Sequence, residues 1–246
     1  MAELDLLSHH ENSEQVRLKK VKLDMNLQKV CTNLEESLEK LFEELKSGVS
    51  EREDSRAFGA MVEKNITQNW KNICSTRGVE DLEIPGRRTI FDFAFKTKGK
   101  IIGVDVKTKD LDSKKYSDGG ICAVGNLFKF LANDNGEFLI AEFGHNNSKL
   151  SKDARDIEYI RVAPFTLLPT QSYRIENLGT GQIRLNYTLN QVWDEIVWDR
   201  TPTEFFDFFT DLAITHYKRV SRDAESRIKS IVKFKEDGYK HFKFSK

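Results

Sequence analysis

Apolar residues recur at helical spacing in the first third of the chain. From Leu27 the steps alternate between four and three, a heptad seam on a helix that ends near Gly48. Its members are Leu27, Cys31, Leu34, Leu38, Leu41 and Leu45. A second helical stripe runs from Ala57 to Cys74. A seam of three heptads could dock on the chain's own domain or pair with a second copy. The pattern favours neither, so both alternatives stay open.

The period changes to two after Pro85 and Gly86, which predicts strands at 89–96 and 100–108. A helix is expected at 120–132, with strands at 137–144, 156–163, 172–178 and 181–187. A long amphipathic helix follows from 203 to 235, and Thr201 to Glu204 read as its N-terminal cap. This order predicts an α/β fold in which helices flank a mixed central β-sheet. We expect an N-terminal helical arm at 1–55 and one domain at 56–246.

The 39 basic and 39 acidic residues give a net charge of zero, but they are segregated along the chain. Residues 86–115 carry nine Lys or Arg against four Asp, and the last 32 residues carry ten against four. Two basic regions in a chain without net charge are consistent with local binding of a polyanion. Ordinary solvated charges would give the same pattern. There is neither a long apolar stretch nor an export signal, so we expect a soluble, intracellular protein with no membrane partner. The three cysteines lack zinc or disulfide spacing.

The segment from Thr89 to Lys107 carries the candidate chemistry. A two-residue turn at Lys98 and Gly99 would place Phe91, Phe93 and Phe95 opposite Val106, Val104 and Ile102, which makes one face apolar. On the other face Asp92 would oppose Asp105, beside the small pair Ala94 and Gly103, with Lys107 one step beyond.

Two directly opposed carboxylates repel each other unless a cation lies between them. Hard oxygen ligands at this spacing suit Mg²⁺, which completes its shell with water and phosphate oxygens. Ala94 and Gly103 would leave room for the substrate, and Lys107 would position the attacking water. The sequence therefore predicts metal-assisted phosphodiester hydrolysis, with Asp92, Asp105 and Lys107 as the catalytic residues. The alternative is a surface hairpin in which Lys107 only pairs with Asp105 and Asp92 faces water.

The acid on one strand and Asp105-Val106-Lys107 on the next resemble the PD-(D/E)xK nuclease superfamily, and its type II restriction endonucleases in particular. Phe91 stands where the pattern nominally has proline. The resemblance covers about residues 56–235 and implies a homodimer that cuts duplex DNA at a short palindromic site with Mg²⁺. It further implies that Asp92, Asp105 and the Val106 carbonyl bind the metal. Glu63 matches a region where such nucleases place an extra acid, although a solvated glutamate explains it as well.

Two segments offer side chains for reading DNA. The loop at 108–120 and the turn at 177–184 carry polar and basic residues suited to phosphate and base contacts, and each could equally be an ordinary turn residue. The candidates are Lys109, Lys114, Lys115, Tyr116, Ser117, Asn177, Thr180, Gln182 and Arg184. The glycine-rich stretch at 119–125 lacks the Lys-Ser/Thr of a phosphate loop, so no nucleotide cofactor is expected. His145 to Asn147 are interpreted as a turn. A repair or junction nuclease and a non-catalytic DNA-binding or coiled-coil protein remain the alternatives.

Overall fold

The computed structural model describes residues 26–45, 55–75, 80–81, 90–113, 120–133, 136–147, 155–176 and 181–236. Its helices are α2 (Leu27–Leu45), α3 (Ser55–Ser75), α4 (Val124–Asn133) and α5 (Pro202–Glu236). Its strands are β1 (Glu80–Asp81), β2 (Phe93–Thr97), β3 (Lys100–Asp110), β4 (Gly120–Ala123), β5 (Gly136–Asn147), β6 (Arg155–Pro164), β7 (Tyr173–Glu176) and β8 (Gln182–Leu185). The mixed α/β class expected from the sequence is confirmed.

A five-stranded sheet forms the centre of the fold, in the order β1-β2-β3-β5-β6. β3 and β5 run parallel, whereas the other neighbours run antiparallel, so the sheet is mixed as predicted. A second sheet of three short antiparallel strands has the order β4-β8-β7. The parallel pair places Asp105, Val106 and Lys107 beside Ile140, Ala141 and Glu142 of β5. β3 therefore lies between two strands, in the middle of the sheet.

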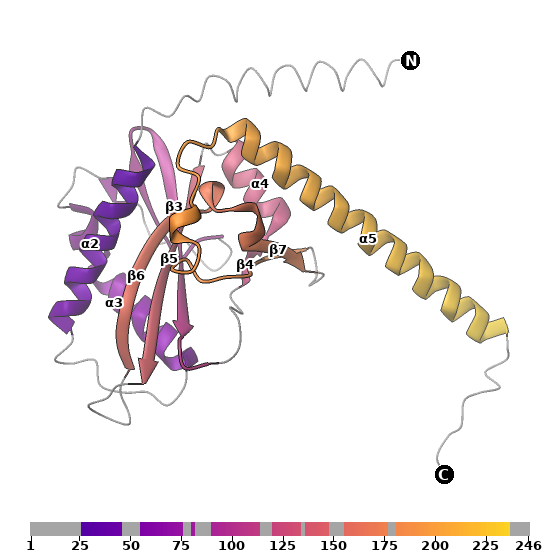
Figure 1. The fold of residues 1–246 in the computed structure, drawn as a ribbon, viewed down its shortest axis with the longest axis horizontal. Helices are drawn as coiled ribbons and strands as arrows, with labels where there is room; N and C mark the ends of the chain where they lie inside the picture. Colours follow the sequence, from indigo (N-terminus) through magenta and orange to yellow (C-terminus); the bar gives the residue numbers. More distant parts are fainter. Residues whose placement is uncertain are drawn as a thin grey trace, which may run out of the picture.

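Helices cover both faces of the central sheet (Figure 1). On one face Phe42 of α2 packs edge-on against Phe143 of β5, and Trp70 of α3 packs against Phe93 of β2. On the other face Phe130 of α4 packs against Phe138 of β5. Alternate residues of a strand point to opposite faces. Phe143 and Phe138 therefore show that α2 and α4 lie on opposite sides of the sheet.

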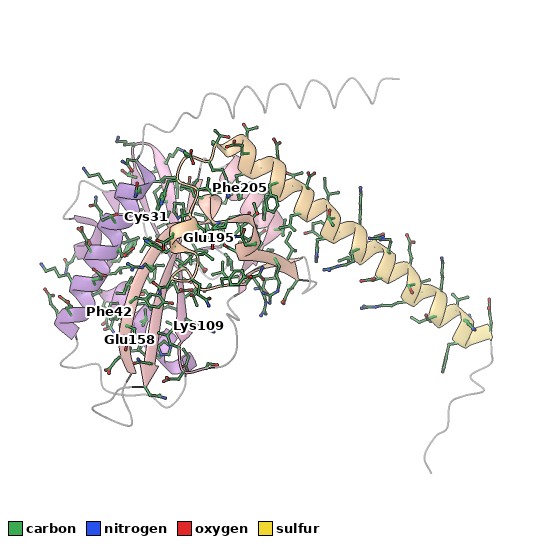
Figure 2. All side chains as sticks on the ribbon, viewed as in Figure 1. Cys31, Phe42, Lys109, Glu158, Glu195 and Phe205 are labelled. Atoms are coloured by element: carbon green, nitrogen blue, oxygen red, sulfur yellow. The ribbon has the colours of Figure 1, made fainter. Side chains whose placement is uncertain are left out.

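The heptad helix α2 docks on its own chain. The buried side chains are Leu27, Cys31, Leu34, Leu38 and Phe42, so the seam shifts from Leu41 to Phe42 in its last turn. Figure 2 marks Cys31 and Phe42 on this helix. Glu35 accepts hydrogen bonds from the Arg161 guanidinium (2.7 Å) and from the Val162 backbone N–H (3.1 Å) of β6. Because β6 is an edge strand, Glu35 satisfies a donor that the sheet leaves open.

Two expectations about local structure are corrected. Residues 120–123 form β4, and only Val124–Asn133 are helical. His145 to Asn147 continue β5 and are not a turn, because the buried His145 packs on Phe58 of α3 with ring centroids 4.1 Å apart. The short strand β1 was not foreseen.

The predicted start of the last helix is confirmed. Thr201 Oγ1 accepts from the Glu204 backbone N–H (3.3 Å), and Glu204 accepts in turn from the Thr201 backbone N–H (2.8 Å). This reciprocal pair is a capping box. No helix among the described residues is long and apolar enough to cross a membrane.

Candidate active site

The hairpin of β2 and β3 forms with the predicted register. Lys98 and Gly99 make its turn, both with positive φ (47° and 75°), as a two-residue turn between twisted strands requires. Phe93 pairs with Val104, Ala94 with Gly103 and Phe95 with Ile102. The buried Phe93, Phe95, Ile102 and Val104 form the apolar face, and Trp70 of α3 covers the two phenylalanines. The hairpin is therefore anchored in the core through one face.

The register departs from the prediction at Asp92, which lies just before β2. Its backbone N–H donates to the Val104 carbonyl at 3.0 Å, although Val104 is already the partner of Phe93. Two successive residues thus oppose one, as in a β-bulge. Asp92 therefore does not lie directly opposite Asp105, as the sequence predicted. Instead its Oδ2 accepts a hydrogen bond from the Val106 backbone N–H at 2.7 Å. The Asp92 side chain thus accepts the bond that a backbone carbonyl would accept if β2 continued.

Phe91 is corrected as well. It was expected opposite Val106 on the apolar face, but its ring lies over Gly103 and packs against Phe130 of α4 (centroids 5.3 Å apart). A Cβ at Gly103 would stand 2.5 Å from Phe91 Cδ1. The space above Gly103, which the sequence assigned to the substrate, is therefore filled by Phe91. Glycine is required here because the ring approaches the strand so closely.

Asp105 and Lys107 form a largely buried ion pair. Lys107 Nζ lies 2.7 Å from Asp105 Oδ2, and the two side chains are 19% and 5% exposed. Burial raises the pKa of Asp105 to about 7; the Lys107 charge opposes this shift, and the charges of Asp92 and Glu63 add to it. Lys107 does pair with Asp105, as the surface-hairpin alternative expects, but Asp105 is buried and not on the surface. A buried carboxyl whose pKa is raised well above its ordinary value is typical of functional sites.

Glu63 comes to the same place from α3. Gly59, one helical turn earlier, lets α3 approach β3 so closely that an added Cβ would stand 3.2 Å from Thr108 Oγ1. Partial desolvation raises the pKa of Glu63, the Asp92 charge raises it further, and the Lys107 charge lowers it. The three carboxylates and Lys107 therefore act on one another electrostatically. The resemblance offered Glu63 as an extra acid near the metal, with a solvated glutamate as the alternative; the side chain is exposed, and its role at the metal stays a prediction.

Cys122 of β4 is a neighbour that the sequence did not reveal. Burial raises the pKa of its thiol to about 12; the Asp105 charge also raises it, and the Lys107 charge lowers it. β4 thus brings the small sheet to the carboxylate cluster. Cys122 had been interpreted only as a reduced core residue, and no spacing in the sequence connects it with the hairpin.

Glu142 is a second buried acid next to Lys107, its register partner across the parallel β3–β5 pair. Its Oε1 accepts from Tyr159 Oη (2.9 Å) and from the Leu189 backbone N–H (2.8 Å). Burial raises the pKa of Glu142 to about 7, although these hydrogen bonds and the Lys109 charge lower it. Glu142 therefore ties β5 to the segment before α5.

The candidate DNA-reading residues are only partly described. Lys114, Lys115, Tyr116, Ser117, Asn177 and Thr180 lie outside the described residues. Lys109 continues β3 two residues beyond Lys107 and is labelled in Figure 2. Gln182 and Arg184 lie on β8, where Gly120 pairs with Arg184 and Ala123 with Gln182. The ends of the two predicted reading segments therefore lie side by side.

Arg184 and Gln182 already have protein neighbours. The Arg184 Nε lies 3.0 Å from Glu176 Oε2, and the Arg174 guanidinium forms an ion pair with the other oxygen of Glu176. The Gln182 amide lies directly over Gly120. Base contacts by either residue stay predictions.

The carboxylate oxygens at this site are the kind of ligand that a divalent cation such as Mg²⁺ prefers. The buried Asp105 Oδ2 has Lys107 Nζ as its neighbour at 2.7 Å, and the charges of Asp92 and Glu63 also act on this carboxylate. Mg²⁺ usually takes only one or two protein carboxylates. In the described part of the chain, no three His, Cys, Asp or Glu side chains form a group that could hold a metal ion. Metal binding by Asp92, Asp105, the Val106 carbonyl and Glu63 therefore stays a prediction.

No protein-family model matches the chain, and no curated protein matches it.

Proposed function

We propose that this chain is a Mg²⁺-dependent deoxyribonuclease of the type II restriction endonuclease class, acting on duplex DNA at a short palindromic site. The observation that carries the proposal is the buried Asp105–Lys107 pair with the Asp92 and Glu63 carboxylates beside it. Asp105 and Lys107 lie on the central strand β3, and the charges of Asp92, just before β2, and Glu63 of α3 act on Asp105. Carboxylates and an amine in this arrangement suit a phosphodiester substrate and a divalent cation.

Asp92 and Asp105 would hold the metal. Bound Mg²⁺ supplies Lewis-acid stabilisation of the phosphate and makes a coordinated water more acidic. Lys107 orients the attacking water and stabilises the negative charge that develops on the phosphate. The Val106 N–H fixes the Asp92 carboxylate, and burial keeps the Asp105 carboxylate poorly hydrated, so both are oriented before substrate binds.

Recognition of DNA is assigned to the segments around β4 and β8, because Cys122 of β4 lies within electrostatic reach of Asp105 and Lys107. Gln182 and Arg184 would read bases, and Lys109 would contact phosphate, together with the predicted residues outside the described ranges. A palindromic site implies two copies related by a two-fold axis. The hairpin motif is most like that of the restriction endonuclease HincII, and such an enzyme acts in the cytoplasm of a prokaryote.

Digestion of a sequenced phage DNA with the purified chain and Mg²⁺ tests this proposal, with the cut ends mapped. Discrete fragments with a common end sequence support a restriction endonuclease. A smear, or nicks confined to branched or damaged DNA, indicates a repair or junction nuclease of the same chemistry. DNA that is bound but never cut, under conditions where the chain is folded, indicates a non-catalytic binding protein.

A further inference from the structure

The second half of α5 extends away from the body of the protein (Figure 1). The first half is anchored through the buried Phe205, Phe209, Ala213 and His216. From Ser221 to Glu236, in contrast, every residue is exposed. An isolated helix of this length is only marginally stable in water, because most helical stability in proteins comes from packing of an apolar face.

This exposed half carries an apolar stripe that starts within the anchored half. Ile214, Tyr217, Ile228 and Ile231 are 45%, 42%, 60% and 68% exposed. With Ser221 and Ala224 between them, the positions 214, 217, 221, 224, 228 and 231 step by three and four, which is the spacing of a coiled-coil seam. Scattered exposed apolar residues need no explanation, whereas a continuous stripe on one helix indicates a binding surface.

We infer that α5 pairs with α5 of a second copy of this chain, in an antiparallel arrangement with a two-fold axis between Ser221 and Ala224. The stripe is self-complementary in this register. Ile214 meets the partner's Ile231, Tyr217 meets the partner's Ile228, and Ser221 meets the partner's Ala224, with each contact repeated by symmetry. The two smallest side chains thus lie at the centre, where the helices approach each other, and large side chains fill both ends.

The charges beside the seam also favour a second copy of α5 in the antiparallel direction. In this register Lys218 flanks the seam opposite the partner's Glu225, so each interface contains two such ion pairs. Both side chains are exposed in the single chain. Four further basic residues lie on the side of the helix away from the seam and would stay in solvent: Arg219, Arg222, Lys229 and Lys233.

A second copy explains the pattern better than a lipid surface does. A membrane-bound helix needs a broad apolar face along its length, whereas Ser221 and Lys235 interrupt the stripe here and the exposed Val232 and Phe234 widen it only near its C-terminal end. The proposed function already calls for two copies at a palindromic site, and the inference rests on it only for that pair; what it adds is the surface that joins the copies. A dimer that survives loss of the α5 stripe overturns the inference and leaves the proposed function standing. A dimer held by α5 that leaves DNA uncut in Mg²⁺ overturns the proposed function alone.

The test is the mass of the full chain, measured by light scattering after size exclusion over a range of concentrations. We expect a dimer for the unchanged protein and a monomer for the double variant Ile228→Lys, Ile231→Lys. The variant should keep the cooperative thermal unfolding of the body and lose at most the helical far-UV circular dichroism of residues 221–236. Ser226→Lys, Ser230→Lys places the same two charges outside the seam; it is the matched control and stays dimeric. A monomeric unchanged protein, with or without binding of its α5 to anionic phospholipid vesicles, overturns the inference, as does a dimer that survives the double variant.

Charge reversal tests the direction of pairing. Lys218→Glu sets two acids against each other at both ends of the contact and is expected to raise the dimer dissociation constant by about tenfold. Adding Glu225→Lys in the same chain restores the opposite-charge contact, and the dissociation constant returns toward that of the unchanged protein. If the second change weakens the dimer further, the antiparallel register is wrong.

Discussion

The Asp92 carboxylate accepts a hydrogen bond from the Val106 backbone N–H at 2.7 Å and so extends the β2–β3 ladder with a side chain. This bond fixes a catalytic candidate to the strand that carries Asp105 and Lys107. Asp92 lies just before β2, which begins at Phe93, and its charge raises the pKa of Glu63 on α3. One contact therefore serves the fold and the proposed chemistry together.

Substitution of Asp92 separates these two roles. Asp92→Asn keeps an oxygen that can accept from Val106, so its free energy of unfolding should stay within about 1 kcal/mol of the unchanged protein. Asp92→Ala removes the acceptor and should lower that free energy by about 1–3 kcal/mol. Both variants should lose DNA cutting. Denaturant unfolding and plasmid cleavage measure the two effects, and an active Asp92→Asn variant would contradict the assignment of Asp92 as a metal ligand.

The contact between Phe91 and Gly103 predicts a coupled pair of substitutions. Gly103→Ala places a methyl group 2.5 Å from Phe91 Cδ1, so the ring must move and Asp92, its neighbour, moves with it. We expect Gly103→Ala to lower the free energy of unfolding by about 1–3 kcal/mol and to reduce cutting. Adding Phe91→Ala should relieve the clash, so the double variant loses less than the sum of the single losses.

Gly125→Ala is the matched control for this pair, because a Cβ there meets nothing within 4 Å. Being inside α4, it should leave stability unchanged or raise it by up to about 1 kcal/mol. Strictly additive losses for Phe91 and Gly103 would show that the two residues do not constrain each other.

Glu63→Gln tests whether the α3 carboxylate serves the site. Removal of one charge beside Asp92 should reduce the rate of cutting by about 10–100-fold, as loss of a supporting group at a metal site does. Stability should change little because Glu63 is exposed. Lys64→Gln, exposed on the same helix, is the control and should cut normally. The readout is the cleavage rate as a function of Mg²⁺ concentration, and equal rates for both variants would remove Glu63 from the site.

Glu142 makes the stability depend on pH in an unusual direction. Burial raises the pKa of Glu142 from 4.5 to about 7. The folded chain therefore holds a proton that the unfolded chain releases between pH 4.5 and 7, so stability contributed by this group falls as pH rises through that window. Glu142→Gln keeps an acceptor for Leu189 and Tyr159 without the charge. It should be more stable than the unchanged protein at pH 8, by about 1–3 kcal/mol, and equally stable near pH 4.

Denaturant unfolding of both proteins at pH 4, 6 and 8 measures this difference. Subtraction isolates Glu142 from other buried acids such as Glu137, which is present in both proteins. A difference that stays constant across the three pH values would show that Glu142 ionises normally in the folded chain.

The elements with strong periodicity could be predicted from the sequence. The seam from Leu27, the capped helix from Pro202 and the hairpin turn at Lys98 and Gly99 follow from local spacing and turn chemistry alone. The site was predictable as far as local register determines it, which is why Asp105 and Lys107 are found on one side of β3.

The remaining features depend on tertiary packing. The bulge at Asp92 arises where Phe91 turns toward Phe130 of α4, a residue 39 positions later in the chain. Cys122 reaches the site only because β4 pairs with β8. No periodicity in the sequence encodes either contact.

The most direct test of the proposed chemistry is the conversion of supercoiled plasmid by the purified full chain. The account predicts linear product at about 10 mM Mg²⁺, a concentration suited to a weakly held ion, and none in EDTA. Asp105→Ala and Lys107→Ala should give no linear product, although both should still bind DNA. Cutting that persists in EDTA, or an Asp105→Ala variant that cuts as fast as the unchanged protein, would contradict it.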